Sequence, residues 1–256
     1  MEAAGRVGDT RFPVDRDLLG RVRAVLATRS GLRFVVGGAG TGKSTVCAEI
    51  GRTRGLEVLD MDARMYGSWF GRFDPGRHPA SHAWSAAPDP LAWQLALDPD
   101  AFAAFHAATT AEALDLLAED LERDDSLAGD PARPILVDGG FGRPIVLAEV
   151  VPPAHVVCLA LPERLQGDVW TASPERRAFL DAVAAAPIAG DPVASFLALD
   201  RRLHAVMAGD ARTAGIPLLE RDETTDVADL AAQVLRSLGI GAGPPTHQGS
   251  AAPPRR

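Results

Sequence analysis

Residues 37–45 read GGAGTGKST, and this stretch constrains the fold more than any other part of the chain. It fits the pattern G-x-x-x-x-G-K-[ST], in which a glycine-rich turn between a strand and a helix points backbone N–H groups at phosphate oxygens. The positive end of the helix dipole adds to this attraction. The flanking residues have the required character, since 32–36 (LRFVV) is typical of a strand and 43–52 is typical of a helix. The sequence therefore predicts a strand, a phosphate-binding loop (the P-loop, residues 37–45) and a helix.

Lys43, inside the P-loop, is the only lysine of the chain, and all the other residues among the 26 Lys and Arg are arginines. A chain that uses arginine wherever either cation serves keeps lysine where a compact ammonium has to fit beside the β- and γ-phosphates. The Ser44 hydroxyl would bind Mg²⁺ in such a loop. The residues that we expect to hold a nucleotide are Gly38, Ala39, Gly40, Thr41, Gly42, Lys43, Ser44 and Thr45.

The composition narrows the class of protein. A chain of 256 residues with a net charge of −8 is long enough for one sizeable core and lacks the basic stripe of a protein that coats nucleic acid. No apolar run is long enough to cross a bilayer, and the first residues lack the apolar core of a signal peptide. We therefore expect a cytoplasmic protein without a membrane partner, in which Cys47 and Cys158 are buried free thiols.

Further segments have the character of strands or helices in alternation. Apolar runs at 56–60, 134–138, 155–161 and 216–219 predict four more strands, and 15–29 and 226–238 have helical spacing, the latter closed by Gly239. Strands that alternate with helices predict a doubly wound α/β fold with a five-stranded parallel sheet. Residues 1–31 would form a lead-in helix before a domain at 32–240, and 241–256 have the composition of a disordered tail.

Two long insertions interrupt this alternation. The first, 66–124, begins as an irregular stretch rich in aromatic residues, arginine and proline, and then becomes helical, with Thr109 and Glu112 as a capping box at the helix start. The second, 162–215, contains a helix that begins at Ser173-Pro174 and another helix through 196–207.

Asp138 ends the third predicted strand, where an aspartate would hold Mg²⁺ through water. A strand-end aspartate is also common in turns, so the metal role depends on the P-loop next to it. The following residue is Gly139, where many ATP-hydrolysing motors have a glutamate that activates water. Residues 138–141 (DGGF) do not fit the D-x-x-G element of GTPase switches, and the sequence has no N-K-x-D element for guanine.

Together, the P-loop, Asp60-Met61-Asp62 after the second strand, Asp138-Gly139-Gly140 after the third and an arginine-bearing segment after the fourth resemble the P-loop small-molecule kinases. That group contains shikimate, gluconate, adenylylsulfate and nucleoside monophosphate kinases. The resemblance implies ATP and Mg²⁺, an acceptor-binding insertion (66–124) and a mobile lid (162–215). It also implies that Asp60 or Asp62 engages an acceptor hydroxyl and that Gly139 and Gly140 line the acceptor site, although Phe141 replaces a third glycine, which disfavours shikimate itself.

Chemistry and position suggest roles for further side chains. A carboxylate at the end of the second strand could take the acceptor proton, and we favour Asp62, with Asp60 serving the metal or capping a turn. Arginines of the second insertion could close over the transferring phosphoryl group, and arginines near the first insertion could bind the acceptor. The lid candidates are Arg164, Arg176 and Arg177, and the acceptor candidates are Arg64, Arg72, Arg77 and Arg143. Trp69, Trp84 and Trp93 are expected to pack the insertion.

The leading hypothesis is an ATP- and Mg²⁺-dependent kinase that phosphorylates a hydroxyl or phosphate of a small metabolite, nucleoside or nucleotide. The alternative is a regulatory ATPase in which the bound nucleotide switches a partner interaction. A P-loop protein that has lost nucleotide binding ranks last, because Lys43, Ser44 and Asp138 are all present. The sequence leaves the acceptor and the oligomeric state open.

Overall fold

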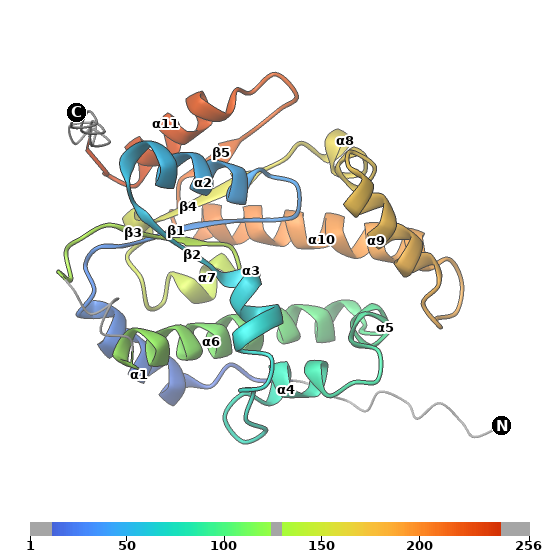
Figure 1. Ribbon diagram of the computed structural model, residues 1–256. Coiled ribbons are helices and arrows are strands. Elements are labelled where there is room, and N and C mark those ends of the chain that lie inside the picture. Colours follow the sequence, from blue (N-terminus) through green and yellow to red (C-terminus); the bar gives the residue numbers. More distant parts are fainter. Residues whose placement is uncertain (1–11, 124–129, 242–256) are drawn as a thin grey trace, which may run out of the picture.

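A computed structural model describes residues 12–123 and 130–241. Its centre is a sheet of five strands, all parallel, in the order β2-β3-β1-β4-β5 (Figure 1). The strands are β1 (Leu32–Gly37), β2 (Glu57–Asp60), β3 (Ile135–Asp138), β4 (Val156–Ala160) and β5 (Leu218–Glu220). The predicted five-stranded parallel sheet of an α/β fold is therefore confirmed.

Helices cover both faces of the sheet because its central strands are apolar on both sides. Neighbouring residues of β1 show this: Phe34 and Val36 belong to one buried cluster, and Val35 belongs to the other. In Figure 1, α2 and α11 lie on one face, and α1, α6, α7 and α10 lie on the opposite face. These helices are α1 (Arg16–Ala27), α2 (Lys43–Arg54), α6 (Pro99–Arg123), α7 (Pro144–Leu147), α10 (Pro192–Thr213) and α11 (Val227–Ser237).

Shorter helices fill the two insertions and one loop. The helix α3 (Met61–Ala63) and the π-helix η1 (Arg64–Ser68) lead into the first insertion, which contains α4 (Pro79–Ser85) and α5 (Pro90–Leu95). The second contains α8 (Glu163–Gln166), the 3-10 helix η3 (Asp168–Trp170) and α9 (Pro174–Ala184), and η2 (Pro153–His155) precedes β4. The predicted start at Ser173-Pro174 is confirmed, since the Ser173 side chain caps α9 and Pro174 is its first residue.

The predicted capping box at Thr109 and Glu112 is wrong, because α6 begins ten residues earlier and runs through both positions. The Thr109 hydroxyl donates to the Phe105 carbonyl of the preceding turn instead. The Glu112 carboxylate accepts hydrogen bonds from the backbone N–H groups of Ala80 (2.9 Å) and Ser81 (2.7 Å) in the first turn of α4. Glu112 therefore caps α4, a helix that tertiary packing places beside α6, and does not cap the helix to which it belongs.

The two cysteines are buried free thiols and Trp69 packs in the core, as the sequence predicts. Cys47 and Cys158 are free and buried, and the Trp69 ring is fully buried in the core. Within residues 12–123 and 130–241, no helix has the length and apolarity needed to span a bilayer. The tail at 242–256 and the start of the lead-in segment at 1–11 lie outside the described residues.

Candidate active site

The carboxyl ends of β1 and β3 lie side by side at the centre of the sheet. The chain leaves β1 through α2 on one face and leaves β3 through α7 on the opposite face (Figure 1). Such a reversal opens a crevice outside the strand ends, which is where open parallel sheets bind ligands. The P-loop follows β1 and Asp138 ends β3, so the fold brings both predicted elements to this crevice.

Close packing of the P-loop backbone explains its glycines. Gly37, Gly40 and Gly42 have φ values of 147°, 72° and 89°, a region that other residues rarely adopt. Space is short as well: a Cβ at Gly37 would lie 2.3 Å from the Leu159 carbonyl oxygen, and one at Gly40 would lie 2.6 Å from Val169. The loop conformation therefore depends on these glycines.

The P-loop places the amino end of α2 at the crevice. No side chain among the described residues caps this end of the helix. The first N–H groups of a helix have no partner within it, so this end can receive an anion. Two side chains bind back to the loop: the Thr41 hydroxyl donates to the Gly38 carbonyl at 2.9 Å, and Lys43 Nζ donates to the same oxygen at 3.2 Å. Thr41 is buried and supports the loop, whereas Lys43 is half-buried at the cavity wall.

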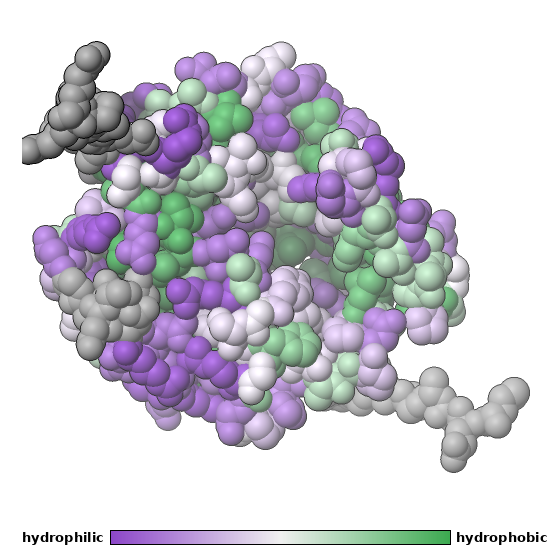
Figure 2. All heavy atoms as spheres, in the orientation of Figure 1, coloured by the Kyte–Doolittle hydropathy of each residue, from purple (hydrophilic) through white to green (hydrophobic). Residues whose placement is uncertain are grey.

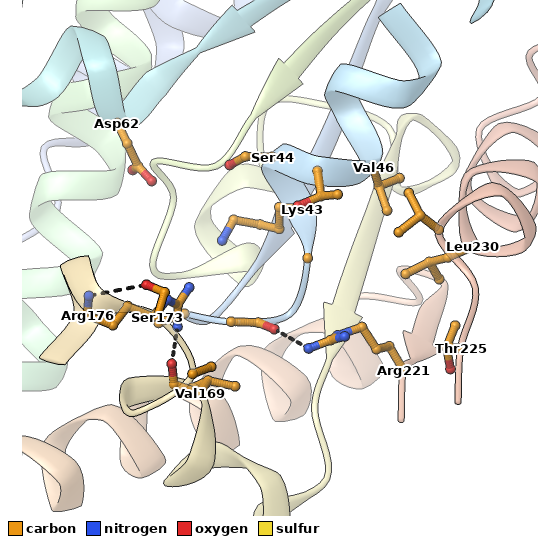
Figure 3. Close-up of a pocket in the computed structure, with 16 residues that line it drawn as sticks. Lys43, Ser44, Val46, Asp62, Val169, Ser173, Arg176, Arg221, Thr225 and Leu230 are labelled. Atoms are coloured by element: carbon orange, nitrogen blue, oxygen red, sulfur yellow. Dashed lines mark hydrogen bonds between the residues drawn. The ribbon is translucent and has the colours of Figure 1, made fainter. Parts of the chain in front are cut away.

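A first cavity of about 450 Å³ lies over the P-loop (Figure 3). Its walls also include Val169, Ser173 and Arg176 from the second insertion, and Thr225, Val227 and Leu230 around the start of α11. The P-loop residues in the wall are Ala39, Gly40, Gly42, Lys43, Ser44 and Thr45. One end of the cavity thus offers apolar side chains, and the other end offers a cation and helix N–H groups.

Two arginines line this cavity on either side of the P-loop as drawn in Figure 3. Arg176, a predicted lid residue, donates from Nη1 to the Val169 carbonyl at 3.1 Å and lies over the Trp170 ring, 5.4 Å from its centroid. Arg221 donates from Nη2 to the Gly40 carbonyl at 2.9 Å, and its Nε is buried without a hydrogen-bond partner in the described structure. Sequence reasoning missed Arg221, although it directly follows β5 and so belongs to the ligand-binding edge of the sheet.

Asp138 lies beside the P-loop and is buried, with 4% of the residue exposed. Burial raises the pKa of this carboxyl, while hydrogen bonding from Ser44 and the charge of Lys43 lower it. Its Oδ1 has no hydrogen-bond partner among the described residues. An unpartnered buried carboxylate oxygen beside a serine hydroxyl matches the donor set of a Mg²⁺ that keeps several waters and takes phosphate oxygens.

The structure separates the two acids that follow β2. The Asp60 side chain accepts a hydrogen bond from the Ala63 N–H at 2.9 Å and caps α3, which is the turn-capping alternative for this residue. Asp62 lines the cavity, where desolvation by the surrounding protein raises the pKa of its carboxyl. Asp60 adds to this increase and Lys43 opposes it. Asp62 is therefore the acid that faces the site.

A second cavity of about 300 Å³ adjoins the first and shares Ala39, Lys43 and Asp62 with it. Gly38 and Gly140 line this second cavity, and Gly139 lies beside the junction, where its Cβ would meet Lys43 and Asp62. Most of the remaining wall comes from the first insertion and α10. Figure 2 shows a hollow near the centre of this face with hydrophobic residues in its depth.

Several predicted arginines line neither cavity. Arg64 forms an ion pair with Asp120, Arg143 with Asp210, and the Arg177 side chain donates to the Thr171 carbonyl. Arg164 pairs with Glu223 at the surface, and Arg72 and Arg77 pair with acids of α6. These arginines hold segments of the protein together.

Within the described ranges, no group of three or more His, Cys, Asp or Glu side chains is arranged to hold a metal ion without further ligands. A divalent cation at Ser44 and Asp138 would therefore need further oxygen ligands, from water or from a bound phosphate. Comparison of the sequence with models of protein families and with curated proteins gave no match.

Proposed function

We propose that this protein is an ATP- and Mg²⁺-dependent phosphotransferase that acts on a small-molecule acceptor, as its resemblance to the P-loop small-molecule kinases implies. The observation that carries the proposal is the pair of adjoining cavities with Lys43 and Asp62 in both walls. A kinase needs one site for the donor, one for the acceptor, and a cation and a base where they meet.

The first cavity suits the donor nucleotide. The uncapped end of α2 and Lys43 would bind the β- and γ-phosphates, and the apolar residues Val46, Val227 and Leu230 would contact the base. Ser44 and Asp138 would hold Mg²⁺, which neutralises charge on the phosphates when bound. Arg176 and Arg221 are placed to add positive charge and to exclude water.

The second cavity suits the acceptor. Asp62 would orient the acceptor hydroxyl and take its proton as the oxygen forms a bond to the γ-phosphorus. The bond between that phosphorus and the β–γ bridging oxygen breaks, and ADP leaves with the electron pair. The surroundings of Asp62 raise the pKa of its carboxyl, which makes it a better proton acceptor than an ordinary aspartate.

The test is acceptor-dependent turnover. The protein is incubated with Mg·ATP and a panel of alcohols, nucleosides and phosphate esters, and phosphorylated products are detected by mass spectrometry. We expect at least one product, which the Asp62→Asn variant forms far more slowly. Brisk ATP hydrolysis with no product from any acceptor would contradict the proposal and favour the regulatory ATPase, for which nucleotide-dependent changes in oligomeric state are the next measurement.

A further inference from the structure

The wall of the second cavity is mostly apolar. Besides Ala39 of the P-loop, seven larger apolar or aromatic side chains line it, and they come from η1, the neighbouring helices of the first insertion, the loop after β3 and α10. They are Met65, Tyr66, Trp84, Phe105, Phe141, Leu203 and Met207. Tyr66 and Trp84 meet edge to face at the rim, with ring centroids 5.6 Å apart. Such walls favour a ligand with an apolar or aromatic ring system.

Charge is confined to one end of this cavity. Among its lining residues in the described structure, the charged ones are Lys43 and Asp62, and both lie at the junction with the first cavity. His106, which also lines the cavity, is neutral near pH 7, because burial and the nearby Arg143 lower its pKa to about 4. Away from the junction, the wall therefore carries no formal charge.

The arginines that could have supplied a cation are engaged elsewhere. Arg64 and Asp120 form a partly buried ion pair that also includes the Trp69 indole N–H. Arg143 binds Asp210 at 2.7 Å and donates to the Ala103 carbonyl at 3.2 Å. An acceptor carboxylate or phosphate would therefore be desolvated in this cavity without a cation of its own, since Lys43 serves the donor phosphates.

The polar groups in the wall are neutral. The Gln94 amide nitrogen lies 3.2 Å from His106 Nε2, and the Thr109 hydroxyl donates to the Phe105 carbonyl. Groups of this kind can pair with a second hydroxyl, a ketone or an amide of the ligand, but they do not balance a full charge.

We infer that the acceptor is an uncharged molecule with an apolar or aromatic ring system and a hydroxyl group that reaches Asp62. The inference rests on the proposed function and narrows it: a hydroxyl is phosphorylated, and acceptors that carry a phosphate or carboxylate, such as nucleoside monophosphates, are excluded. The reaction is transfer of the γ-phosphoryl group from ATP to that hydroxyl, with release of ADP and a proton.

A matched pair of probes tests the charge preference. Para-hydroxymethyl benzamide and para-hydroxymethyl benzoate share a ring and a hydroxyl but differ in charge. Binding of each is measured by ligand-observed NMR in the presence of Mg·ADP, where no transfer can occur. We expect the neutral probe to bind at least about tenfold more tightly. Preference for the benzoate, or no binding of either probe or of the corresponding naphthalene pair at the highest soluble concentration, would overturn the inference.

A substitution in the wall provides the reciprocal test. Gln94→Arg places a guanidinium beside the ring of the probe and should raise the affinity for the benzoate by at least about tenfold. The same change at Gln233, on α11 and outside both cavities, is the control and should leave the preference unaltered. Retained stabilisation by Mg·ADP shows that each variant is folded. An unchanged preference in Gln94→Arg would overturn the inference.

The inference and the proposed function fail in different ways. If the benzamide binds but no acceptor of the panel, neutral or anionic, is phosphorylated with Mg·ATP, the kinase proposal fails and the assignment of the cavity to a neutral ring-bearing ligand stands. If anionic alcohols are phosphorylated faster than neutral ones, the kinase proposal stands and the inference fails.

Discussion

Lys43 and Asp62 both approach the backbone at Gly139: a Cβ there would be 3.4 Å from Lys43 Cε and 3.5 Å from Asp62 Oδ2. Lys43 begins α2 after β1, Asp62 belongs to α3 after β2, and Gly139 follows β3. Three neighbouring strands therefore bring together a cation (Lys43), an acid (Asp62) and a glycine without a side chain (Gly139). The predictions below follow from this arrangement and from the contacts that support it.

Replacing Lys43 by arginine should reduce phosphoryl transfer by about 10²- to 10³-fold, although the charge is kept. The planar guanidinium cannot occupy the position of the compact ammonium beside the loop. Initial rates with saturating acceptor measure the loss. The opposite exchange at Arg52, an exposed residue of α2 paired with Glu49, is the control and should leave the rate near normal. Near-normal activity of Lys43→Arg would mean that the lone lysine has no special role.

Asp62→Asn should lower kcat by about 10²- to 10⁴-fold while nucleotide binding is retained. The base must be deprotonated to act, and its pKa is raised in the folded protein, so the wild-type rate should fall on acidification at a pH above the usual aspartate range. A pH–rate profile measures this acid limb, which should be absent from the residual activity of the variant. Asp60→Ala, which removes the cap of α3, should mainly affect stability, by about 0.5–2 kcal/mol.

Asp138→Asn should raise the Mg²⁺ concentration needed for half-maximal stabilisation by ADP about 10- to 100-fold. The variant loses the carboxylate charge at the proposed metal site but keeps the size of the side chain. Thermal unfolding across a Mg²⁺ titration is the measurement, with Asp181→Asn on the exposed face of α9 as the control. An unaltered Mg²⁺ requirement would remove Asp138 from the proposed metal site.

Arg221→Ala should weaken nucleotide binding by about tenfold, because the hydrogen bond to the Gly40 carbonyl and a cation in the cavity wall are both lost. Calorimetric titration with Mg·ADP measures the change. Arg236→Ala, at an exposed position on the neighbouring helix α11, should bind the nucleotide like the wild type. Equal affinities for the two variants would contradict a role for Arg221 at the donor site.

Asp115→Ala should lower the free energy of unfolding by about 3–5 kcal/mol. The Asp115 side chain is fully buried on α6, pairs with Arg77 at 2.6 Å and lies 3.0 Å from His78 Nε2, and Arg21 of α1 also contacts it. Its loss leaves these groups facing one another without an anion. Urea denaturation measures the effect, and Asp100→Ala, exposed in the first turn of the same helix, should cost less than about 1 kcal/mol. A similar decrease in the free energy of unfolding for both variants would show that the buried ion pairs of Asp115 contribute little to stability.

The fold and the donor end of the site were predictable because their signals are local. The P-loop pattern needs only eight consecutive residues, and each strand is a short apolar run beside turn residues. Strand ends of a parallel sheet share one edge, so the loop, Asp62 and Asp138 could be assigned to one site before any coordinates were known. The site roles themselves stay predictions.

The parts that could not be predicted depend on partners distant in sequence. Glu112 looks like half of a capping box until α4 is placed against it, 31 and 32 residues away. Arg64 and Arg143 look like free cations until Asp120 and Asp210 are seen beside them. Arg221 carries no motif, and its proximity to Gly40, 181 residues away, arises only from the pairing of β4 and β5 with the central strands.

Because Lys43 is the only lysine, its chemical modification can be used to measure how much of the proposed nucleotide site is occupied. An acylating reagent that is selective for primary amines has two kinds of target in this chain, the α-amino group and the ε-amine of Lys43. Mass spectrometry of the peptide that contains Lys43 separates modification of that ε-amine from modification of the α-amino group, and no other side chain contributes to the signal. A nucleotide whose phosphates cover Lys43 would slow the acylation of this lysine. The extent of acylation would then report nucleotide occupancy without a label on the ligand.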